Sequence, residues 1–338
     1  MRVLYIIIIL LAVGITTANG QQVITLNYPP NKTVMEFYTA NISLTLPQGS
    51  VDSITVITNN RERLEIIPDS KTECFPVPLS LGVNKIIITA IKDGKPIDEI
   101  LVSVFRRSDL DSQYRKPPNG FQKDYFHAKE RPLCAGCHIL EPGDADRKPV
   151  NIAAFPDEEL IIDKNELTKT STCYSCHKKL TSYPFVHGPA AVWSCLSCHD
   201  PVTDLKYEVR KPFTKICYSC HIKQKEEREP KKYFHGPLTT GKCTICHNPH
   251  ASENPMNLHK SIWNLCISCH IDNGSGRHIV KLFPGTNFHP TRGVIDPSRK
   301  GRELSCTSCH DPHTSDSPKL WKFDAGSGFA LCRKCHNN

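Results

Sequence analysis

The 338-residue sequence predicts two parts: an N-terminal antiparallel β-sandwich, followed by a region of short helices with little regular structure. Residues 22–107 alternate apolar and polar side chains in short runs between turn signals, as half-buried strands do. From residue 127 onward, eight Cys-x-x-Cys-His runs follow one another. This leaves about 26 residues for each run, too few for an ordinary apolar core, so the chain there must wrap around something else.

Strands are expected at 41–46, 51–57, 85–91 and 97–105. The last two are joined by Lys92-Asp93-Gly94-Lys95, a hairpin signal, because Asp-Gly suits a tight turn. Short strands at this spacing favour a β-sandwich, which we place at 21–107. Residues 108–126, which contain Lys116-Pro-Pro-Asn-Gly120, are expected to form a linker.

The stretch from Leu79 to Gly94 resembles the late-strand motif of bacterial immunoglobulin-like modules. Such modules usually serve as spacers or docking platforms, so the resemblance implies one of these roles for residues 21–107. A solubilising cap without a partner is the alternative.

The first 20 residues predict an export signal. Met1-Arg2 is followed by an apolar run from Val3 to Val13 and by small residues up to Gly20. The apolar run is shorter than the roughly 20 residues that a membrane-spanning helix needs. We therefore expect cleavage near Gly20, no membrane span afterwards, and a periplasmic, cell-surface or extracellular location. An uncleaved anchor is the alternative.

The repeated Cys-x-x-Cys-His run is the attachment signature of c-type haem. Its two thiols can form thioethers with the porphyrin, and its His supplies the proximal imidazole. Zinc ribbons also use paired Cys-x-x-Cys units and exported chains use disulfides, but neither explains a His after every pair. Eight haem c groups are therefore expected on Cys134, Cys137, Cys173, Cys176, Cys195, Cys198, Cys217, Cys220, Cys243, Cys246, Cys266, Cys269, Cys306, Cys309, Cys332 and Cys335. The leftover Cys74 is expected to be a buried, small apolar residue.

The sixteen His residues allow two axial ligands for each of eight irons. The proximal ligands are His138, His177, His199, His221, His247, His270, His310 and His336. The distal candidates are His127, His187, His235, His250, His259, His278, His289 and His313, with Met256 as another possible ligand. Since an iron with two axial ligands has no position for a substrate, this count favours electron transfer over catalysis.

Residues 127–338 form a fourfold repeat with units at 127–177, 187–221, 235–270 and 289–336. Each unit begins with a His beside an aromatic residue and then has two Cys-x-x-Cys-His motifs. This organisation resembles the doubled C-x-x-C-H family of multihaem cytochromes. Units three and four also match its C-H-x-P-H pattern, with His250 and His313. Units one and two depart from it, because Leu140 or Glu141 and Val202 stand near that position.

The resemblance implies an electron carrier or conduit of the bacterial periplasm, outer membrane or cell exterior. Its partners would be redox protein donors and acceptors, such as other multihaem cytochromes or an outer-membrane porin–cytochrome module. Two alternatives are a self-assembled extracellular cytochrome filament and an octahaem oxidoreductase of nitrogen or sulfur oxyanions. The reductase is disfavoured because none of the eight motifs is altered.

The formal net charge is +8. That figure omits the cofactor, and the propionates of eight haems would make the holoprotein acidic or near neutral. Lys and Arg side chains are therefore expected to pair with propionates, and no nucleic-acid partner is expected.

Overall fold

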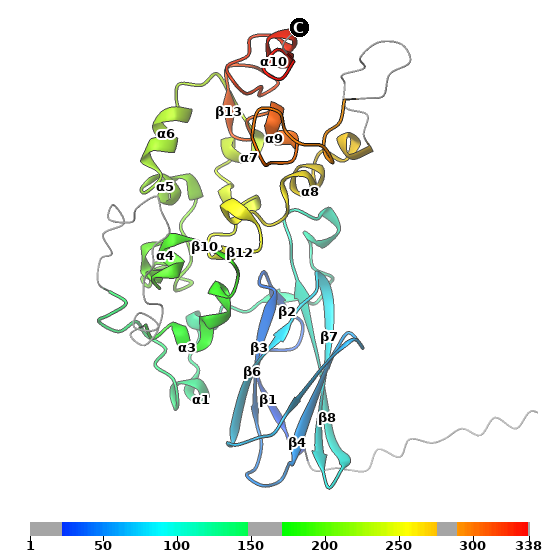
Figure 1. The fold of residues 1–338 in the computed structure, drawn as a ribbon. Coiled ribbons are helices and arrows are strands. Elements are labelled where there is room, and N and C mark those ends of the chain that lie inside the picture. The colour runs from blue at the N-terminus through cyan, green and yellow to red at the C-terminus, as the bar shows by residue number, and fades with distance from the viewer. Residues whose placement is uncertain (1–21, 148–170, 276–288, 337–338) are drawn as a thin grey trace, which may run out of the picture. The chain divides into compact units, whose positions relative to one another are not determined.

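The computed structural model describes residues 22–147, 171–275 and 289–336 (Figure 1). The chain divides into two compact units. The first comprises Met1–Arg106 with Pro117–Asp124, and the second comprises Arg107–Lys116 with Tyr125–Asn338. The segment expected to be a linker thus contributes to both units. The expected export signal lies outside the described residues.

Two sheets form the first unit. The smaller has the order β1-β3-β6, from β1 (Thr25–Tyr28), β3 (Thr39–Thr45) and β6 (Thr72–Pro78). The larger has the order β5-β4-β7-β8-β2-β9, from β5 (Glu62–Ile66), β4 (Ser53–Thr58), β7 (Gly82–Lys92), β8 (Lys95–Arg106), β2 (Thr33–Met35) and β9 (Gln122–Lys123). All pairs are antiparallel except those of β2, which pairs in parallel with β8 and β9.

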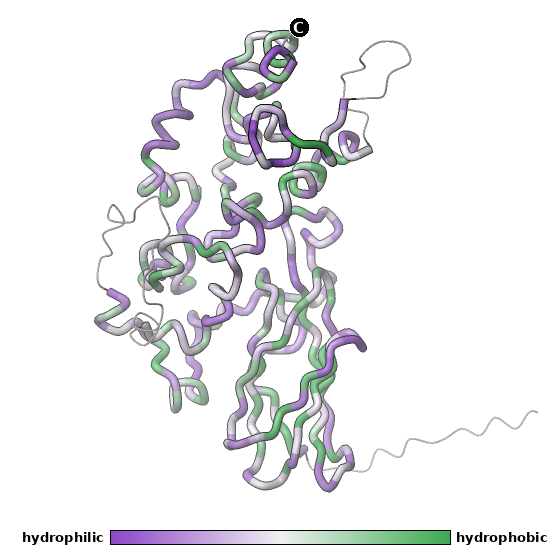
Figure 2. The backbone as a smooth tube through the Cα atoms, viewed as in Figure 1, coloured by the Kyte–Doolittle hydropathy of each residue, from purple (hydrophilic) through white to green (hydrophobic). Residues whose placement is uncertain are grey.

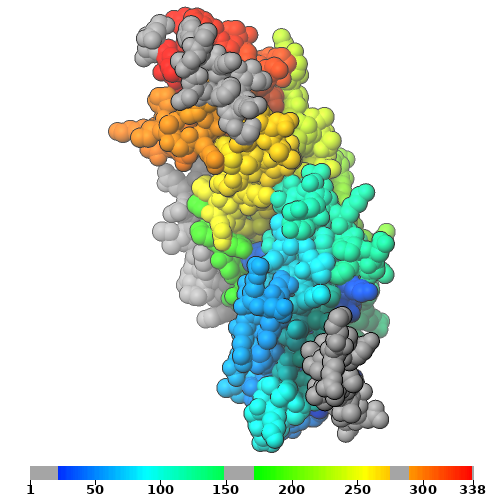
Figure 3. Space-filling view, turned by 90° about the vertical axis from the view of Figure 1, so that its right-hand side faces the viewer, coloured from blue at the N-terminus to red at the C-terminus, as the bar shows by residue number. Residues whose placement is uncertain are grey.

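The core of this unit lies between the two sheets. Ile42 and Leu44 of β3 are fully buried with Ile54 of β4 and with Ile86 and Ile88 of β7. Figure 2 shows the alternation of apolar and polar positions along these strands. The unit's surface is blue to cyan in Figure 3. The β-sandwich predicted from the sequence is confirmed.

The β7–β8 hairpin turns where the sequence predicts it. Asp93 and Gly94 both have positive φ, +50° and +70°, as a two-residue turn matching the twist of the strands requires. The prediction for Cys74 is wrong, since its side chain is exposed. It lies on the outer face of β6, where strand alternation turns Phe75 and Val77 inward instead, and its Sγ is 3.5 Å from the Oγ of Ser43.

The second unit is built from short helices of three to seven residues. Its described helices are η1 (Ser112–Tyr114), η2 (Phe126–Ala128), α1 (Pro132–Ala135), α3 (Tyr174–His177), η4 (Lys178–Thr181), α4 (Gly188–Ala191), η5 (Cys195–Ser197), α5 (Phe213–Tyr218), α6 (Ile222–Arg228), α7 (Gly236–Thr239), η6 (Cys243–Ile245), η7 (Pro255–Asn257), α8 (Ile262–Ile267), η8 (Ile271–Ser275), α9 (Cys306–Cys309) and α10 (Gly328–Cys332). Two small antiparallel pairs join distant segments: β10 (Phe185–Val186) with β12 (Ala251–Ser252), and β11 (Tyr233–Phe234) with β13 (Thr314–Ser315). This matches the predicted region of short helices.

Protein atoms alone give the second unit little core. Its described residues include only seven buried apolar side chains, Leu110, Val192, Trp193, Ala251, Leu258, Leu304 and Ala325. They are scattered along the chain, whereas the first unit has one continuous cluster. The physical account from the sequence, in which the chain wraps a non-protein core, fits this distribution. In the described residues, no helix has the length and hydropathy needed to cross a membrane.

Candidate haem sites

The eight Cys-x-x-Cys-His motifs, numbered here as sites 1 to 8 in chain order, share one backbone conformation. In each, the N–H of the His donates to the carbonyl of the first Cys, at 2.9 to 3.1 Å. This is the hydrogen bond of one helical turn, which brings side chains three and four residues apart to one face. The two thiols and the imidazole of a motif therefore project from the same face. All seventeen thiols are free, so those of the motifs are open to thioether formation.

Six imidazole pairs face each other across the second unit. Each pairs a proximal His with one predicted distal His, and the ring centroids are 6.0 to 6.2 Å apart. The pairs are His177 with His127, His221 with His187, His199 with His250, His270 with His235, His247 with His313, and His336 with His289. The first five are stacked, and the last is edge-on at 84°.

These separations fit one metal ion between the two rings. An imidazole nitrogen binds a metal at about 2 Å, which places the centroids of two opposed rings about 6 Å apart. A porphyrin supplies four nitrogens around its iron, so only two protein ligands are needed. Within 22–147, 171–275 and 289–336, no three His, Cys, Asp or Glu side chains converge on a metal site. Paired rings beside paired thiols therefore fit haem c at these six sites.

Hydrogen bonds to backbone carbonyls orient several of these rings. The Nδ1 atoms of His199, His247 and His310 lie 2.6, 2.8 and 2.8 Å from the carbonyl oxygens of Tyr207, Met256 and Lys319. An imidazole that uses Nδ1 in this way keeps Nε2 for the metal. His187 has the same arrangement, with Nδ1 3.0 Å from the Pro249 carbonyl.

Burial lowers the pKa of several of the opposed rings and so favours their neutral form. It lowers the pKa of His177 and of His250 to about 4, and neighbouring imidazoles add to the effect. Burial likewise lowers the pKa of His187, His235 and His247. Neutral imidazole is the form that binds metal, so these rings need not lose a proton near neutral pH.

A simple rule assigns the His that follows the aromatic residue. His127, His187, His235 and His289 each face the second motif of their own unit, at sites 2, 4, 6 and 8. Three of the four are preceded by Phe, at 126, 234 and 288, and His187 follows Phe185 by two residues. Recurrence at equivalent places was the reason for predicting these four as ligands.

The other two pairs cross between units. His250 of unit three faces His199 at site 3 in unit two, and His313 of unit four faces His247 at site 5 in unit three. The small strand pairs hold these two crossed ligands in place. The N–H of His187 donates to the carbonyl of His250 at 2.9 Å beside β10 and β12. The N–H of His235 does the same to His313 at 2.8 Å beside β11 and β13.

Thiol contacts between units link successive sites. Cys173 and Cys195, the first thiols of sites 2 and 3, share a hydrogen bond that lowers the pKa of Cys173 to about 7 and raises that of Cys195. The first thiols of sites 4 and 5, and of sites 6 and 7, repeat this contact. Within units, burial and then the second thiol of the next motif raise the pKa of Cys198, Cys246 and Cys309, the second thiols of sites 3, 5 and 7. Successive sites from 2 to 8 are thus linked in sequence order, with hydrogen bonds between first thiols alternating with electrostatic interactions between second thiols.

The structure does not pair the predicted ligands His259, His278 and Met256 with a proximal His, and their ligation stays a prediction. The Nε2 of His259 is 3.0 Å from the Thr244 carbonyl oxygen. Met256 offers its carbonyl to His247, while its residue is 60% exposed. His278 lies outside the described residues. Of the proximal residues, His138 and His310 have no facing ring among the pairs above.

A buried carboxylate that the sequence analysis missed supports site 7. Asp296, 1% exposed, accepts hydrogen bonds from Ser298, from Arg299 Nε at 2.6 Å and from Ser308 Oγ at 2.6 Å. Burial alone would raise its pKa, but these bonds hold the pKa well below its ordinary value. Ser308 lies between the two cysteines of site 7. This network has no counterpart in the repeat pattern, so the sequence offered no signal for it.

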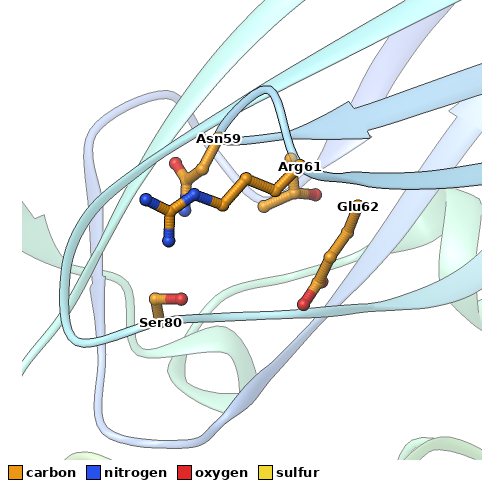
Figure 4. A pocket seen from close by; sticks show the side chains of 5 residues that line it. Asn59, Arg61, Glu62 and Ser80 are labelled. Carbon is orange, nitrogen blue, oxygen red and sulfur yellow. The ribbon is translucent and has the colours of Figure 1, made fainter.

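A cavity at one end of the first unit carries none of this chemistry. Its volume is about 260 Å³, and Thr58, Asn59, Arg61, Glu62 and Ser80 line it (Figure 4). It holds neither Cys nor His, and we assign it no role.

Comparison with known proteins finds the doubled CXXCH motif family in three segments, 187–226, 235–275 and 297–338. These segments contain sites 3 to 8. No curated protein is significantly similar to the chain.

Similar solved structures are distant and cover only part of the chain. An engineered protein has 16% identity and a TM-score of 0.22 over 25% of this chain, and the match spans only 20% of that protein. Fibronectin(III)-like modules of Clostridium thermocellum CbhA have 12% identity and a TM-score of 0.21, over 30% of this chain and 99% of theirs. An FMN-binding beta-glucuronidase from Facaelibacterium prausnitzii L2-6 has 15% identity and a TM-score of 0.21, over 29% of this chain and 14% of that protein. It is the C-terminal half of the chain that carries the doubled CXXCH motifs of proteins that bind c-type haem.

Proposed function

We propose that this protein is an exported electron conduit that holds eight c-type haems, most of them between two imidazoles. The observation that carries the proposal is the set of six facing His pairs, with centroids 6.0 to 6.2 Å apart. Each pair stands beside the thiols of one motif. Bound haem would supply an iron that takes up and releases one electron at a time.

The chain's own task is to hold these sites in a fixed order. Hydrogen bonds between first thiols and electrostatic interactions between second thiols link successive sites from 2 to 8, which supports this order. Such an arrangement supports a single path along the sequence from site 2 to site 8. The crossed ligands His250 and His313 tie unit two to unit three and unit three to unit four, so the spacing of these units depends on residues that would also bind the metal.

Two axial imidazoles favour electron transfer over catalysis at the six paired sites. A metal with both axial positions filled by protein has none left for a substrate. Backbone carbonyls that hold the Nδ1 atoms of His187, His199 and His247 also disfavour ligand exchange at their sites. We therefore propose a carrier, not a reductase, for this part of the molecule.

Location and partners follow from the same chemistry. The predicted export signal favours the periplasm or the cell exterior, where c-type haem is attached. The partners would be redox proteins, including other multihaem cytochromes or an outer-membrane porin–cytochrome module. The N-terminal β-sandwich would serve as a spacer or docking platform for them.

The experiment is a two-sided transfer assay with exported holoprotein. A low-potential donor is mixed with the protein in a stopped-flow instrument, and an external acceptor is then added. Reduction and reoxidation of all haem absorbance support a conduit. Absorbance that stays oxidised with every donor, or a fraction that never exchanges electrons with the rest, would contradict a single path.

A further inference from the structure

The distal ligand of a first-motif site comes from the following unit. His250, three residues after the motif His of unit three, serves site 3, and His313, at the same offset in unit four, serves site 5. By the same rule, the distal position of site 1 in unit one belongs to the residue at this offset in unit two. That residue is Val202.

Backbone geometry places Val202 where the ligating His stands in the later units. The N–H of His250 donates to the side chain of Asn248 at 3.0 Å, and that of His313 to Asp311 at 2.8 Å. The N–H of Val202 donates to Asp200 at 2.9 Å in the same i to i+2 turn. The three residues therefore share the same turn, three positions after the motif His. A valine side chain has no atom that can bind iron, and this one is 84% exposed.

Among the described residues, no other imidazole is paired with His138 in the way that the six pairs face each other. The Nε2 of His259 lies 3.0 Å from the carbonyl oxygen of Thr244, beside site 5. From residue 139 to residue 176 the sequence has neither His nor Met. Site 7 has no following unit, but His310 makes further interactions, so the inference concerns site 1 alone.

We infer that the iron of site 1 is held by His138 alone and keeps its distal position for a small exogenous ligand that binds through one donor atom. The inference rests on the proposed function, because it needs a haem at site 1. It adds a ligand-binding site at site 1. An iron with one protein ligand is high-spin, whereas the six paired sites give low-spin iron.

The test uses carbon monoxide as the probe on reduced, exported holoprotein. Intact mass first establishes that eight haems are present. The difference spectrum should then show about one carbon monoxide bound per chain, and the oxidised protein should show a high-spin electron paramagnetic resonance signal. Removing the attachment thiols of site 1, in the double variant Cys134→Ala/Cys137→Ala, should abolish both signals and leave seven haems.

Residue 202 provides the matched pair of variants. Val202→His places an imidazole in the distal slot and should abolish carbon monoxide binding, while Val202→Ala should bind as the wild type does. Eight haems with no carbon monoxide binding, or binding that survives the removal of site 1, would overturn the inference and leave the proposed function standing. Binding that survives in Val202→His with eight haems would overturn the placement of residue 202 at the distal position. A protein without haem would instead overturn the proposed function.

Discussion

The crossed ligand His250 allows the sharpest test of the site geometry. It lies three residues after His247 of site 5, yet its ring faces His199 of site 3, with centroids 6.0 Å apart and planes within 5°. His250→Ala should therefore open the iron of site 3 and leave site 5 unchanged. The contact with the neighbouring strand survives, because His187 donates to the backbone carbonyl of residue 250.

The variant should open one iron in each chain, which is one of the eight expected haems. Carbon monoxide binding to the reduced variant should rise by about one equivalent over the wild type, with a matching gain in the high-spin resonance signal. His250→Met should give no gain, because a thioether still fills the axial position, but should raise the potential of one haem.

Two double variants identify the iron that changes. Removal of site 3 with Cys195→Ala/Cys198→Ala should cancel the gain caused by His250→Ala. Removal of site 5 with Cys243→Ala/Cys246→Ala should not. If the gain instead disappears with site 5, the ligand belongs to its sequence neighbour and the crossed assignment is wrong.

Four further predictions concern stability. Asp296→Ala leaves Arg299 and the buried Ser308 without their carboxylate and should lower the free energy of unfolding by about 3–5 kcal/mol. Asp316→Ala, at an exposed ion pair with Lys231, should lower it by less than about 1 kcal/mol. Equal shifts in the guanidinium unfolding midpoints of the two variants would refute this. Because hydrogen bonds hold the pKa of Asp296 below its ordinary 3.8, its contribution should be complete above that pH and fall away below it, in acid titrations followed by Soret absorbance. Ile88→Ala, in the sandwich core, should cost about 2–5 kcal/mol in the unfolding of the first unit with an unchanged haem spectrum; altered haem bands would show that the core of the first unit also supports the haem sites. Finally, chain made without haem should keep the strand signal of the first unit in circular dichroism but lose protease resistance after residue 125, and a fully resistant apoprotein would contradict a haem core.

The sequence predicted the attachment chemistry because that chemistry is local. A Cys-x-x-Cys-His run is a single helical turn, so its spacing alone places two thiols and an imidazole together. The four His residues beside aromatics could be found in the same way, since they recur once in every unit. Strand alternation likewise located β3, β4, β7 and β8, because one face of each strand is buried.

The pairing of ligands could not be predicted from the sequence. His250 and His313 each adjoin one motif in the sequence and face another in the structure. The cause is two pairs of two-residue strands, each formed between segments more than 60 residues apart. Strands of two residues are too short to show an alternation of apolar and polar residues in the sequence. The same limit hid the Asp296 network, which depends on side chains brought together by turns, and the outward face of Cys74, which depends on the register of β6.

The central claim is that the second unit is organised around covalently attached haem. Its most direct test is the intact mass of the exported protein, measured together with its Soret absorbance and metal content. The account predicts a mass equal to the processed chain plus eight haems, with eight irons and no zinc. A mass equal to the polypeptide alone, or zinc in place of iron, would contradict it.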